Sequence, residues 1–570
     1  MSTTLPVVNR QPDLVGQLLQ EQQELSAVEQ FSDWHSGHES DAATAAPAQE
    51  KYYRSLLPAS APGPGQQFAF EVDLNACSGC KACVVACHTL NGLEEDESWR
   101  RVGTLLIGDP AAADVSAIQH VTTACHHCED PGCLNGCPVK AYDKDPVTGI
   151  VRHLDDQCIG CKYCTMMCPY EVPQYSDRLG IVRKCDMCHQ RLSVGEAPAC
   201  VQSCPNEAIR ITIVPSDGSD AATEESLVPS APSSTITRPT TRYVAEATFD
   251  PAQTRPQDEH VDEVAESHWP LALMLVATQI SVGILIAESI ATLVLTAFGI
   301  TVPGAVPIAA ALSAFAIGNV GLGIAPLHLG QPLRMWRVFL GLKTSWLSRE
   351  AVVLGKFMGL LAGGIALLLL PVVWDWIPTS VQDMIPTQWI PDWAGRALLT
   401  ASIPVGLAGL YCSAMIYIAT KRRLWRSGRT LPRFFGTTLT CGPIIAAVLF
   451  AFAGFGGTAS VLCLVGAAAG CWKWMRERQL YRSPADLDDP YDRRSRRLVG
   501  NHLGEMLRMR GFSAVVATLL AGLAVVMCPF LPAAGGVCAA MSAAVWIAGE
   551  SLERLLYFQS VVYDRMPGTL

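Results

Sequence analysis

The chain has 570 residues, of which 50% are apolar and 16% charged, and its net charge is −10. This length is too great for a single core, and the composition is too apolar for a typical soluble enzyme. The arginines flank apolar runs and do not form a basic face, which argues against a nucleic-acid-binding protein.

Residues 1–66 are rich in Gln, Ala, Ser and Pro, so we expect a mostly disordered N-terminal segment. One amphipathic helix over residues 11–31 is an equally good interpretation. The first 30 residues show neither a positively charged region before an apolar core nor a twin-arginine start. We therefore expect no export signal in this segment.

Residues 67–213 contain sixteen of the 22 cysteines, in the groups CSGCKACVVACH, CHHCEDPGCLNGCP, CIGCKYCTMMCP and CDMCHQRLSVGEAPACVQSCP. Close CxxC groups in a long chain indicate metal binding and not a disulfide framework. The sixteen residues are Cys77, Cys80, Cys83, Cys87, Cys125, Cys128, Cys133, Cys137, Cys158, Cys161, Cys164, Cys168, Cys185, Cys188, Cys200 and Cys204.

The spacing within these groups predicts iron–sulfur clusters. Three closely spaced cysteines bind one cubane, and a fourth cysteine followed by Pro reaches a neighbouring cluster. Sixteen thiolates are enough for four [4Fe–4S] clusters. Zinc is the alternative, but zinc sites rarely place a third cysteine so near a CxxC pair. We therefore expect an α+β domain of tandem ferredoxin-like type, which relays electrons and has no substrate site of its own.

Residues 214–268 carry 11 acidic and 3 basic residues. Their apolar content is too low for a core, so we expect an acidic linker.

From residue 269 to residue 570 the sequence predicts an all-α bundle of eight transmembrane helices. Most of the apolar segments reach the ~20 residues that span a bilayer, and eight in succession argue against a soluble helical protein. The segments lie near 270–297, 304–328, 350–373, 395–419, 434–454, 456–472, 511–530 and 535–558.

Basic residues crowd the second, fourth and sixth connections between these segments. By the positive-inside rule, these connections and both termini should be cytoplasmic. We expect a multi-pass protein of the bacterial inner membrane with its cysteine-rich part on the cytoplasmic side.

Between residues 269 and 570 there are two histidines, His328 and His502. A bis-histidine haem needs two facing imidazoles, so we expect no haem and expect quinol, such as menaquinol, to bind near the cysteine-rich part. His328 ends the second span and Glu350 begins the third, which suits proton acceptors for quinol oxidation. Arg334 or Arg337 could steady the quinolate. The alternative is that His328 caps a helix and Glu350 forms an ion pair.

Other polar residues in the spans are few. Glu550 and Arg554 are four residues apart and are expected to form a structural ion pair. Glu288 lies deep in its span and could bond to Asn319.

Residues 73–213 resemble the four-cluster iron–sulfur subunit of dimethyl sulfoxide reductase-type molybdoenzymes. The likeness is carried by the second and third cysteine groups, the run VPQYSDRLGIVRKCDMC and the close GEAPACVQSCP. Residues 267–570 resemble the membrane anchor subunit of these enzymes, through HLGQPLRMWRVFLGLKTSWLSRE and GESLERLLYFQSVVYDRMPG. The two subunits are separate chains in the family and look fused here.

The resemblance implies how the cysteines pair, because in the family the first group shares clusters with the fourth and the second with the third. The implied sets are Cys77, Cys80, Cys83 with Cys204; Cys185, Cys188, Cys200 with Cys87; Cys125, Cys128, Cys133 with Cys168; and Cys158, Cys161, Cys164 with Cys137.

These features predict an electron-transfer and membrane-anchor subunit. It would oxidise quinol from the membrane pool and pass electrons to a separate molybdopterin subunit that reduces the substrate. One alternative is a redox-driven ion pump, which would need several deep, paired ionisable residues. Another is the same electron path run in reverse, to reduce quinone.

Overall fold

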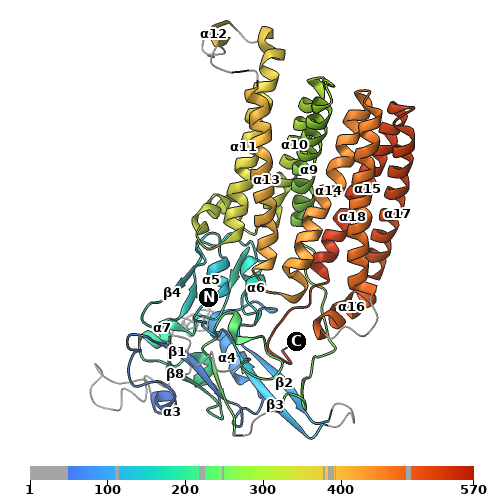
Figure 1. The fold of residues 1–570 in the computed structure, drawn as a ribbon. Helices are drawn as coiled ribbons and strands as arrows, with labels where there is room; N and C mark the ends of the chain where they lie inside the picture. Colours follow the sequence, from blue (N-terminus) through green and yellow to red (C-terminus); the bar gives the residue numbers. More distant parts are fainter. Residues whose placement is uncertain are drawn as a thin grey trace, which may run out of the picture.

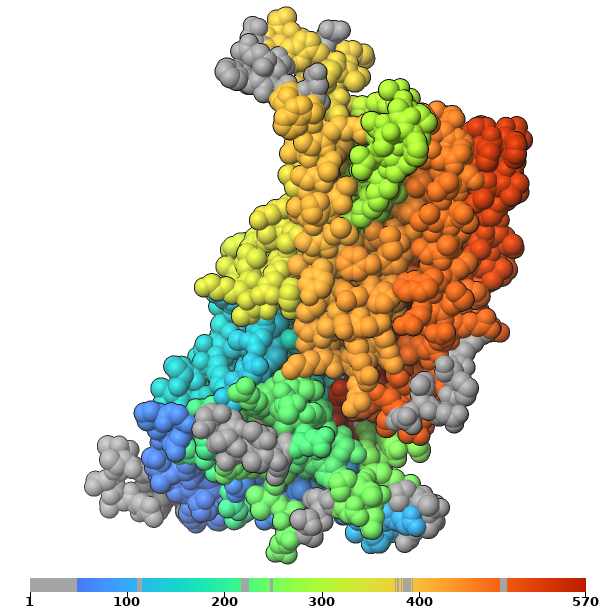
Figure 2. Space-filling model, in the orientation of Figure 1, coloured from blue at the N-terminus to red at the C-terminus, as the bar shows by residue number. Residues whose placement is uncertain are grey.

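The computed structural model describes residues 49–109, 115–216, 225–246, 250–376, 379–382, 391, 393–482 and 489–569. The helix expected over 11–31, and most of the segment expected to be disordered, lie outside these residues. A cysteine-rich domain of short elements forms the base, and the long helices stand on it (Figures 1 and 2).

The cysteine-rich domain is built from short strands and helices because loops that carry the cysteines separate them. Its elements are α3 (Glu50–Tyr53), η1 (Arg54–Leu56), β1 (Gln66–Asp73), α4 (Ala82–Asn91), β2 (Arg101–Ile107), β3 (Ala117–Thr123), α5 (Gly132–Gly136), β4 (Tyr142–Lys144), β5 (Val151–His153), α6 (Tyr163–Met167), β6 (Gln174–Ser176), β7 (Ile181–Arg183), α7 (His189–Ser193), α8 (Ala199–Gln202) and β8 (Ile209–Pro215).

The first and third cysteine groups fold alike. Both contain a CxGCK run in which the glycine and the lysine have positive φ: 71° at Gly79, 62° at Lys81, 68° at Gly160 and 57° at Lys162. The two lysines then cap the N-termini of α4 and α6. Left-handed conformations are costly for lysine, so such a repeat is typical of a loop held around a bound group.

The segment expected to be a linker is folded against the cysteine-rich domain in its described parts, 225–246 and 250–268. Strand β9 (Arg242–Val244) pairs in parallel with β1, and β10 (Thr254–Pro256) pairs antiparallel with β2. Before β9 come η2 (Ser234–Ile236) and Thr241, whose hydroxyl is 2.9 Å from Nδ1 of His126. Edge pairing and hydroxyl bonds need little apolar surface, which explains how an acidic, polar segment is ordered here.

In the part of the chain that the structure describes, eight helices are long and apolar enough to cross a membrane. They are α9 (Trp269–Ala297), α10 (Ala305–Ile324), α11 (Trp346–Val373), α13 (Ala394–Ile418), α14 (Ser427–Phe452), α15 (Gly456–Arg482), α17 (Gly504–Met527) and α18 (Pro532–Gln559). The connecting elements are η3 (Ala325–His328), η4 (Pro332–Gly341), η5 (Trp374–Trp376), α12 (Thr379–Gln382), η7 (Arg423–Trp425) and α16 (Pro490–His502).

The basic connections lie at the helix ends that face the cysteine-rich domain, which we call the domain-side ends (Figure 1). Arg422, which precedes η7, donates hydrogen bonds to the carbonyls of Met166 and Thr165 at 3.1 and 3.3 Å. After α18 the chain returns to the domain, where Met566 is buried and the Gly568 amide donates to Asp258 at 2.9 Å. The two halves therefore form one continuous structure.

Candidate functional site

The outer cysteines of the domain gather in two sets. Burial raises the pKa of Cys77, and the neighbouring Cys83, Cys204 and Cys80 add to the rise. Because such effects act at short range, the first group lies beside the last cysteine of the fourth.

The second outer set lies around Cys87, whose pKa is raised to about 12 by burial and by the nearby Cys200 and Cys188. Cys185 is also a neighbour of Cys87. The fourth group therefore lies beside the last cysteine of the first.

The inner cysteines gather in the same crossed manner. Burial raises the pKa of Cys133, with Cys168, Cys125 and Cys128 as contributing neighbours. Burial also raises the pKa of Cys164, together with Cys161, Cys158 and Cys137. Each of the four sets thus joins three cysteines of one group to one cysteine of another.

The surroundings of the sulfur atoms suit iron–sulfur clusters. Backbone amides of Ala141, Ala208 and Gly160 donate to the Sγ atoms of Cys137, Cys204 and Cys158 at 3.2, 3.3 and 3.4 Å. Such donors stabilise thiolates that are held by metal.

The arrangement of the side chains does not match a site for one metal ion. In the described residues, no three His, Cys, Asp or Glu side chains lie close enough to hold a single metal ion. A cubane spreads its cysteine ligands over several irons, so its sulfurs stand farther apart than those around one zinc ion.

Two buried cations lie between neighbouring sets. Lys184 is 2% exposed and donates to Cys125 Sγ at 3.5 Å and to the carbonyl of Cys185 at 2.8 Å. Arg100 is also 2% exposed, and Cys200, Cys83, Cys185 and Cys87 all act on its pKa. A buried cation next to several thiolates offsets part of the cost of their negative charge.

The third cysteine group contacts the membrane half directly. The amide of Gln331 donates to the carbonyl of Ile159 at 3.0 Å, and its side chain donates to the carbonyl of Leu179 at 2.9 Å. Gly330 lies against Gly160 and Gly180 so closely that an added Cβ would stand 2.1 Å from the Gly180 oxygen. The segment that follows His328 therefore docks on the loop between Cys158 and Cys161.

His328 ends η3 at this contact. Its Nδ1 bonds to the carbonyl of Ala325, and its Nε2 is buried with no hydrogen-bond partner. The charges nearest to the ring are those of His268, Lys162 and Glu266. Lys162 donates to both oxygens of Glu266 at 2.8 Å, and His268 Nδ1 is 3.9 Å from the same carboxylate.

Glu350, in the second turn of α11, is 6% exposed, and its Oε1 is buried without a partner. It lies near Tyr163, since burial and then Cys161 and Glu350 raise the pKa of that phenol. The Tyr163 hydroxyl donates to the carbonyl of Ile416 at 2.8 Å. Residues 162 and 163, inside the third cysteine group, thus face His328 and Glu350 respectively.

Arg334 lies elsewhere. Its guanidinium donates to the carbonyls of Asp155 and Cys158 at 3.3 and 3.2 Å, so it fastens the membrane half to the third cysteine group. Arg337 similarly donates to the carbonyl of Asp156 at 3.0 Å. The structure thus brings His328 and Glu350 to the two sides of one loop, while Arg334 anchors that loop from outside.

Sequence reasoning missed Lys162, Tyr163, Glu266 and His268. Lys162 and Tyr163 stand between two cysteine ligands. A lysine and a tyrosine at that position were the sequence feature that could have identified them. His268 was missed because histidines were counted from residue 269. With His268 included, the membrane boundary carries one more imidazole than the argument against haem assumed.

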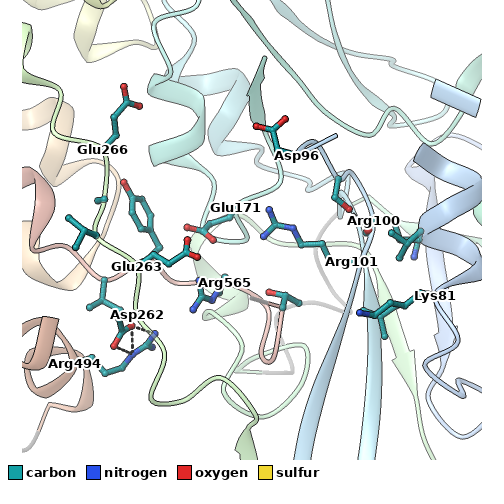
Figure 3. Close-up of a pocket in the computed structure, with 18 residues that line it drawn as sticks. Lys81, Asp96, Arg100, Arg101, Glu171, Asp262, Glu263, Glu266, Arg494 and Arg565 are labelled. Atoms are coloured by element: carbon teal, nitrogen blue, oxygen red, sulfur yellow. Dashed lines mark hydrogen bonds and ion pairs between the residues drawn. The ribbon is translucent and has the colours of Figure 1, made fainter. Parts of the chain in front are cut away.

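A cavity of about 590 Å³ lies between the cysteine-rich domain and the tail after α18. Figure 3 shows Glu171, Glu263 and Arg565 around its middle, with Glu266 at one edge. Glu266 belongs both to this cavity and to the surroundings of His328. Burial raises the pKa of Glu171, so its neutral form is favoured there.

The membrane half contains a buried ion network that the sequence analysis did not predict. Glu550 pairs with Lys473 and with Arg510, the latter at 2.9 Å, and not with Arg554 as expected. Arg554 instead lies 3.6 Å from Glu553 and donates to Gln279 at 3.0 Å. The full network is Arg433, Lys473, Glu477, Arg510, Glu550, Glu553 and Arg554.

Glu288 also differs from expectation. Its partners are Thr292 at 2.8 Å and Arg396 at 3.6 Å, whereas Asn319 donates to the carbonyl of Phe315. Arg396 stands at the start of α13, so this pair lies toward the helix ends remote from the cysteine-rich domain (Figure 1).

Comparison with known families matches both halves of the chain. Residues 116–213 match a 4Fe-4S dicluster domain, and residues 264–469 match the DMSO reductase anchor subunit family (DmsC). The match to the first family covers three of the four cysteine groups.

Curated relatives match the cysteine-rich half. The B subunit of anaerobic dimethyl sulfoxide reductase from Escherichia coli (strain K12) is 40% identical over 148 residues, which are 25% of this protein and 72% of the relative. The corresponding B subunit from Haemophilus influenzae is 34% identical over 180 residues, 30% of this protein and 87% of the relative. The hydrogenase-2 operon protein HybA of Escherichia coli O157:H7 is 36% identical over 160 residues, 24% of this protein and 49% of the relative.

Proposed function

Because the chain belongs to the family of iron–sulfur and membrane-anchor subunits of dimethyl sulfoxide reductase-type enzymes, fused here into one chain, we propose that it oxidises membrane quinol for a separate catalytic subunit. Its role as an electron-transfer and anchor subunit follows from the family. The quinol reaction, the cluster count and the side of the membrane are part of the proposal.

The four cysteine sets would hold four [4Fe–4S] clusters, which when bound supply one-electron carriers. The set of Cys137, Cys158, Cys161 and Cys164 packs against the membrane helices through a shared apolar core. Cys185 is a neighbour of Cys125, which joins the inner sets to the outer ones. The set with Cys77 is the last on this electron path. Its Cys80 is exposed, which suits electron transfer to a partner subunit.

The observation that carries the quinol proposal is the pair of unpartnered buried atoms, His328 Nε2 and Glu350 Oε1, beside residues 162 and 163. Buried polar atoms are usually bonded, so these two atoms beside one loop are suited to hydrogen bonds with a polar ligand. A quinol offers two hydroxyls, and its oxidation releases two protons with two electrons. An imidazole and a carboxylate are suitable acceptors for these protons.

The protons would leave through the 590 Å³ cavity. Glu266 connects the surroundings of His328 with that cavity, and its side chain is 54% exposed. Burial lowers the pKa of His268, so the uncharged form of its ring is favoured beside this route.

The domain-side ends would face the cytoplasm, because they carry the basic connections. Proton release and substrate reduction would then occur in one compartment, so the reaction would not build a proton gradient. The partner would be a molybdopterin subunit. Since the relatives are named after several enzymes, the partner would determine the substrate.

A redox-driven ion pump is the second candidate, and the buried ion network favours it. This function requires several paired ionisable residues within the bundle, and the network supplies seven buried ones, toward the domain-side ends of the helices. Ion-dependent turnover in proteoliposomes would support the pump. Turnover that is independent of the ion gradient would reject it.

The quinol proposal is tested by replacing His328 with Ala. The four clusters should still form and be reduced by dithionite in EPR spectra, while reduction by a menaquinol analogue should slow by about 10²-fold, the size of a typical acid–base contribution. His502→Ala, at the end of α16, is the matched control and should behave as wild type. Normal quinol-driven reduction in His328→Ala would return His328 to the role of a helix cap.

A further inference from the structure

A second cavity, of about 230 Å³, opens between the domain-side ends of α14 and α15, and we call it the α14–α15 pocket. It is separate from the redox path described above. Its lining is Gly428, Arg429, Pro432, Arg433, Lys473, Arg476, Glu477, Gln479 and Leu480.

Positive charge dominates this lining, with four basic residues and one carboxylate. Arg429 is held by Asp492 through two bonds of 2.7 and 2.6 Å, and Lys473 is held within the buried ion network. Within the described part of the chain, no carboxylate pairs with Arg476. Among the described residues, the guanidinium of the exposed Arg476 thus stands without a paired carboxylate, next to cations that are already fixed in place.

The pocket lies close to the domain-side ends of both helices, where a membrane-spanning helix would meet the lipid headgroups. Arg429 and Arg433 lie two and six residues from the start of α14, or about 3 and 9 Å along the helix axis. Arg476 lies six residues before the end of α15, again about 9 Å. Basic pockets between transmembrane helices at this depth bind anionic lipid headgroups.

Helix α15 also carries exposed apolar residues before the pocket-lining Lys473 and Arg476 and beside them. They are Val461, Leu464, Val465, Trp472 and Met475, which are 47 to 59% exposed. A polar pocket together with an exposed apolar helix face suits a molecule that has a charged headgroup and acyl chains. A free ion would make no contact with the apolar residues.

We propose that the α14–α15 pocket binds the phosphodiester headgroup of an anionic phospholipid, whose acyl chains lie along α15. Arg476 and Arg433 would contact the phosphate oxygens, since guanidinium groups match phosphate geometry. The bound lipid would add negative charge at the domain-side ends of α14 and α15, beside the network members Arg433, Lys473 and Glu477.

The test is native mass spectrometry of the full-length protein, exchanged from detergent into nanodiscs of phosphatidylglycerol or of phosphatidylcholine. The wild type should retain phosphatidylglycerol and not phosphatidylcholine. Arg476→Gln should lower phosphatidylglycerol retention about fivefold, as expected for one basic residue at an anionic surface. Arg478→Gln is the matched control, because Arg478 lies two residues along α15 and lines a different cavity.

Equal retention of the two lipids, or equal retention by Arg476→Gln and Arg478→Gln, would overturn the proposal. Displacement of phosphatidylglycerol by excess inorganic phosphate would also overturn it, because the pocket would then take free phosphate. Circular dichroism of both variants should match the wild type, since both side chains are exposed.

Discussion

At the scale of single residues, the candidate quinol site depends on two atoms that have no partner inside the described part of the protein. His328 and Glu350 could be singled out from the sequence because each is an ionisable residue at the end of an apolar run. Their relation to Lys162 and Tyr163 could not be found that way, because it depends on how the third cysteine loop folds against η3 and α11. Local sequence patterns identify ionisable residues at the membrane boundary, whereas contacts between distant segments can be identified only from the structure.

The crossed cysteine sets give a prediction at this scale. Cys204→Ser should remove one cluster and about four iron atoms, and adding Cys80→Ser should remove no more, because both residues serve the same cluster. Adding Cys188→Ser to Cys204→Ser should instead remove about eight iron atoms, from two clusters. Iron analysis with EPR spectra checks this, and loss of a second cluster from the Cys80 and Cys204 pair would contradict the pairing.

At the scale of elements, the number of spans was predicted and their domain-side ends were not. Helix α14 begins at Ser427 and α17 at Gly504, whereas the apolar runs begin at 434 and 511. Both helices continue through charged residues, of which Arg433 and Arg510 are paired in the buried ion network, and hydropathy alone contains no such information. The same holds for the linker, which is ordered by strand pairing with β1 and β2.

The contact between η3 and the third cysteine loop gives a second prediction. In Gly330→Ala the added methyl group would meet the Gly180 oxygen at 2.1 Å, so the contact must open. We expect a loss of about 1–3 kcal/mol in stability and slower quinol-driven cluster reduction. Thermal unfolding in detergent and stopped-flow reduction measure the two effects.

Gly323→Ala is the control for that experiment, because an added Cβ there meets nothing within 4 Å. If both alanine variants reduce their clusters at the wild-type rate, the close approach of Gly330 to the cysteine loop has no part in electron transfer from quinol.

At the scale of the whole molecule, one buried ion network ties α14, α15, α17 and α18 together, and Arg554 extends it to Gln279 of α9. Isolated charges in a membrane are costly, and mutual pairing removes much of this cost. The broad order of the chain, a cysteine-rich domain followed by eight spans, was readable from composition. The network was not, because its members are far apart in the sequence.

The network gives the third prediction. Glu550→Gln keeps the shape of the side chain but leaves Lys473 and Arg510 with one carboxylate fewer, which should cost about 3–5 kcal/mol. Thermal unfolding in detergent should show a clearly lower midpoint, and Glu505→Gln, an exposed site on α17, should leave it unchanged. Equal midpoints for the two variants would mean that the network does not stabilise the bundle.

The most direct test of quinol binding at His328 and Glu350 is photo-crosslinking with an azido-menaquinone analogue, followed by peptide mapping. Labels are expected within residues 325–331, at 346–350 and on the third cysteine loop around Tyr163, and they should be lost when excess menaquinol competes. Labels confined to the opposite helix ends, near Glu288 and Arg396, would contradict a quinol site beside the third cysteine group.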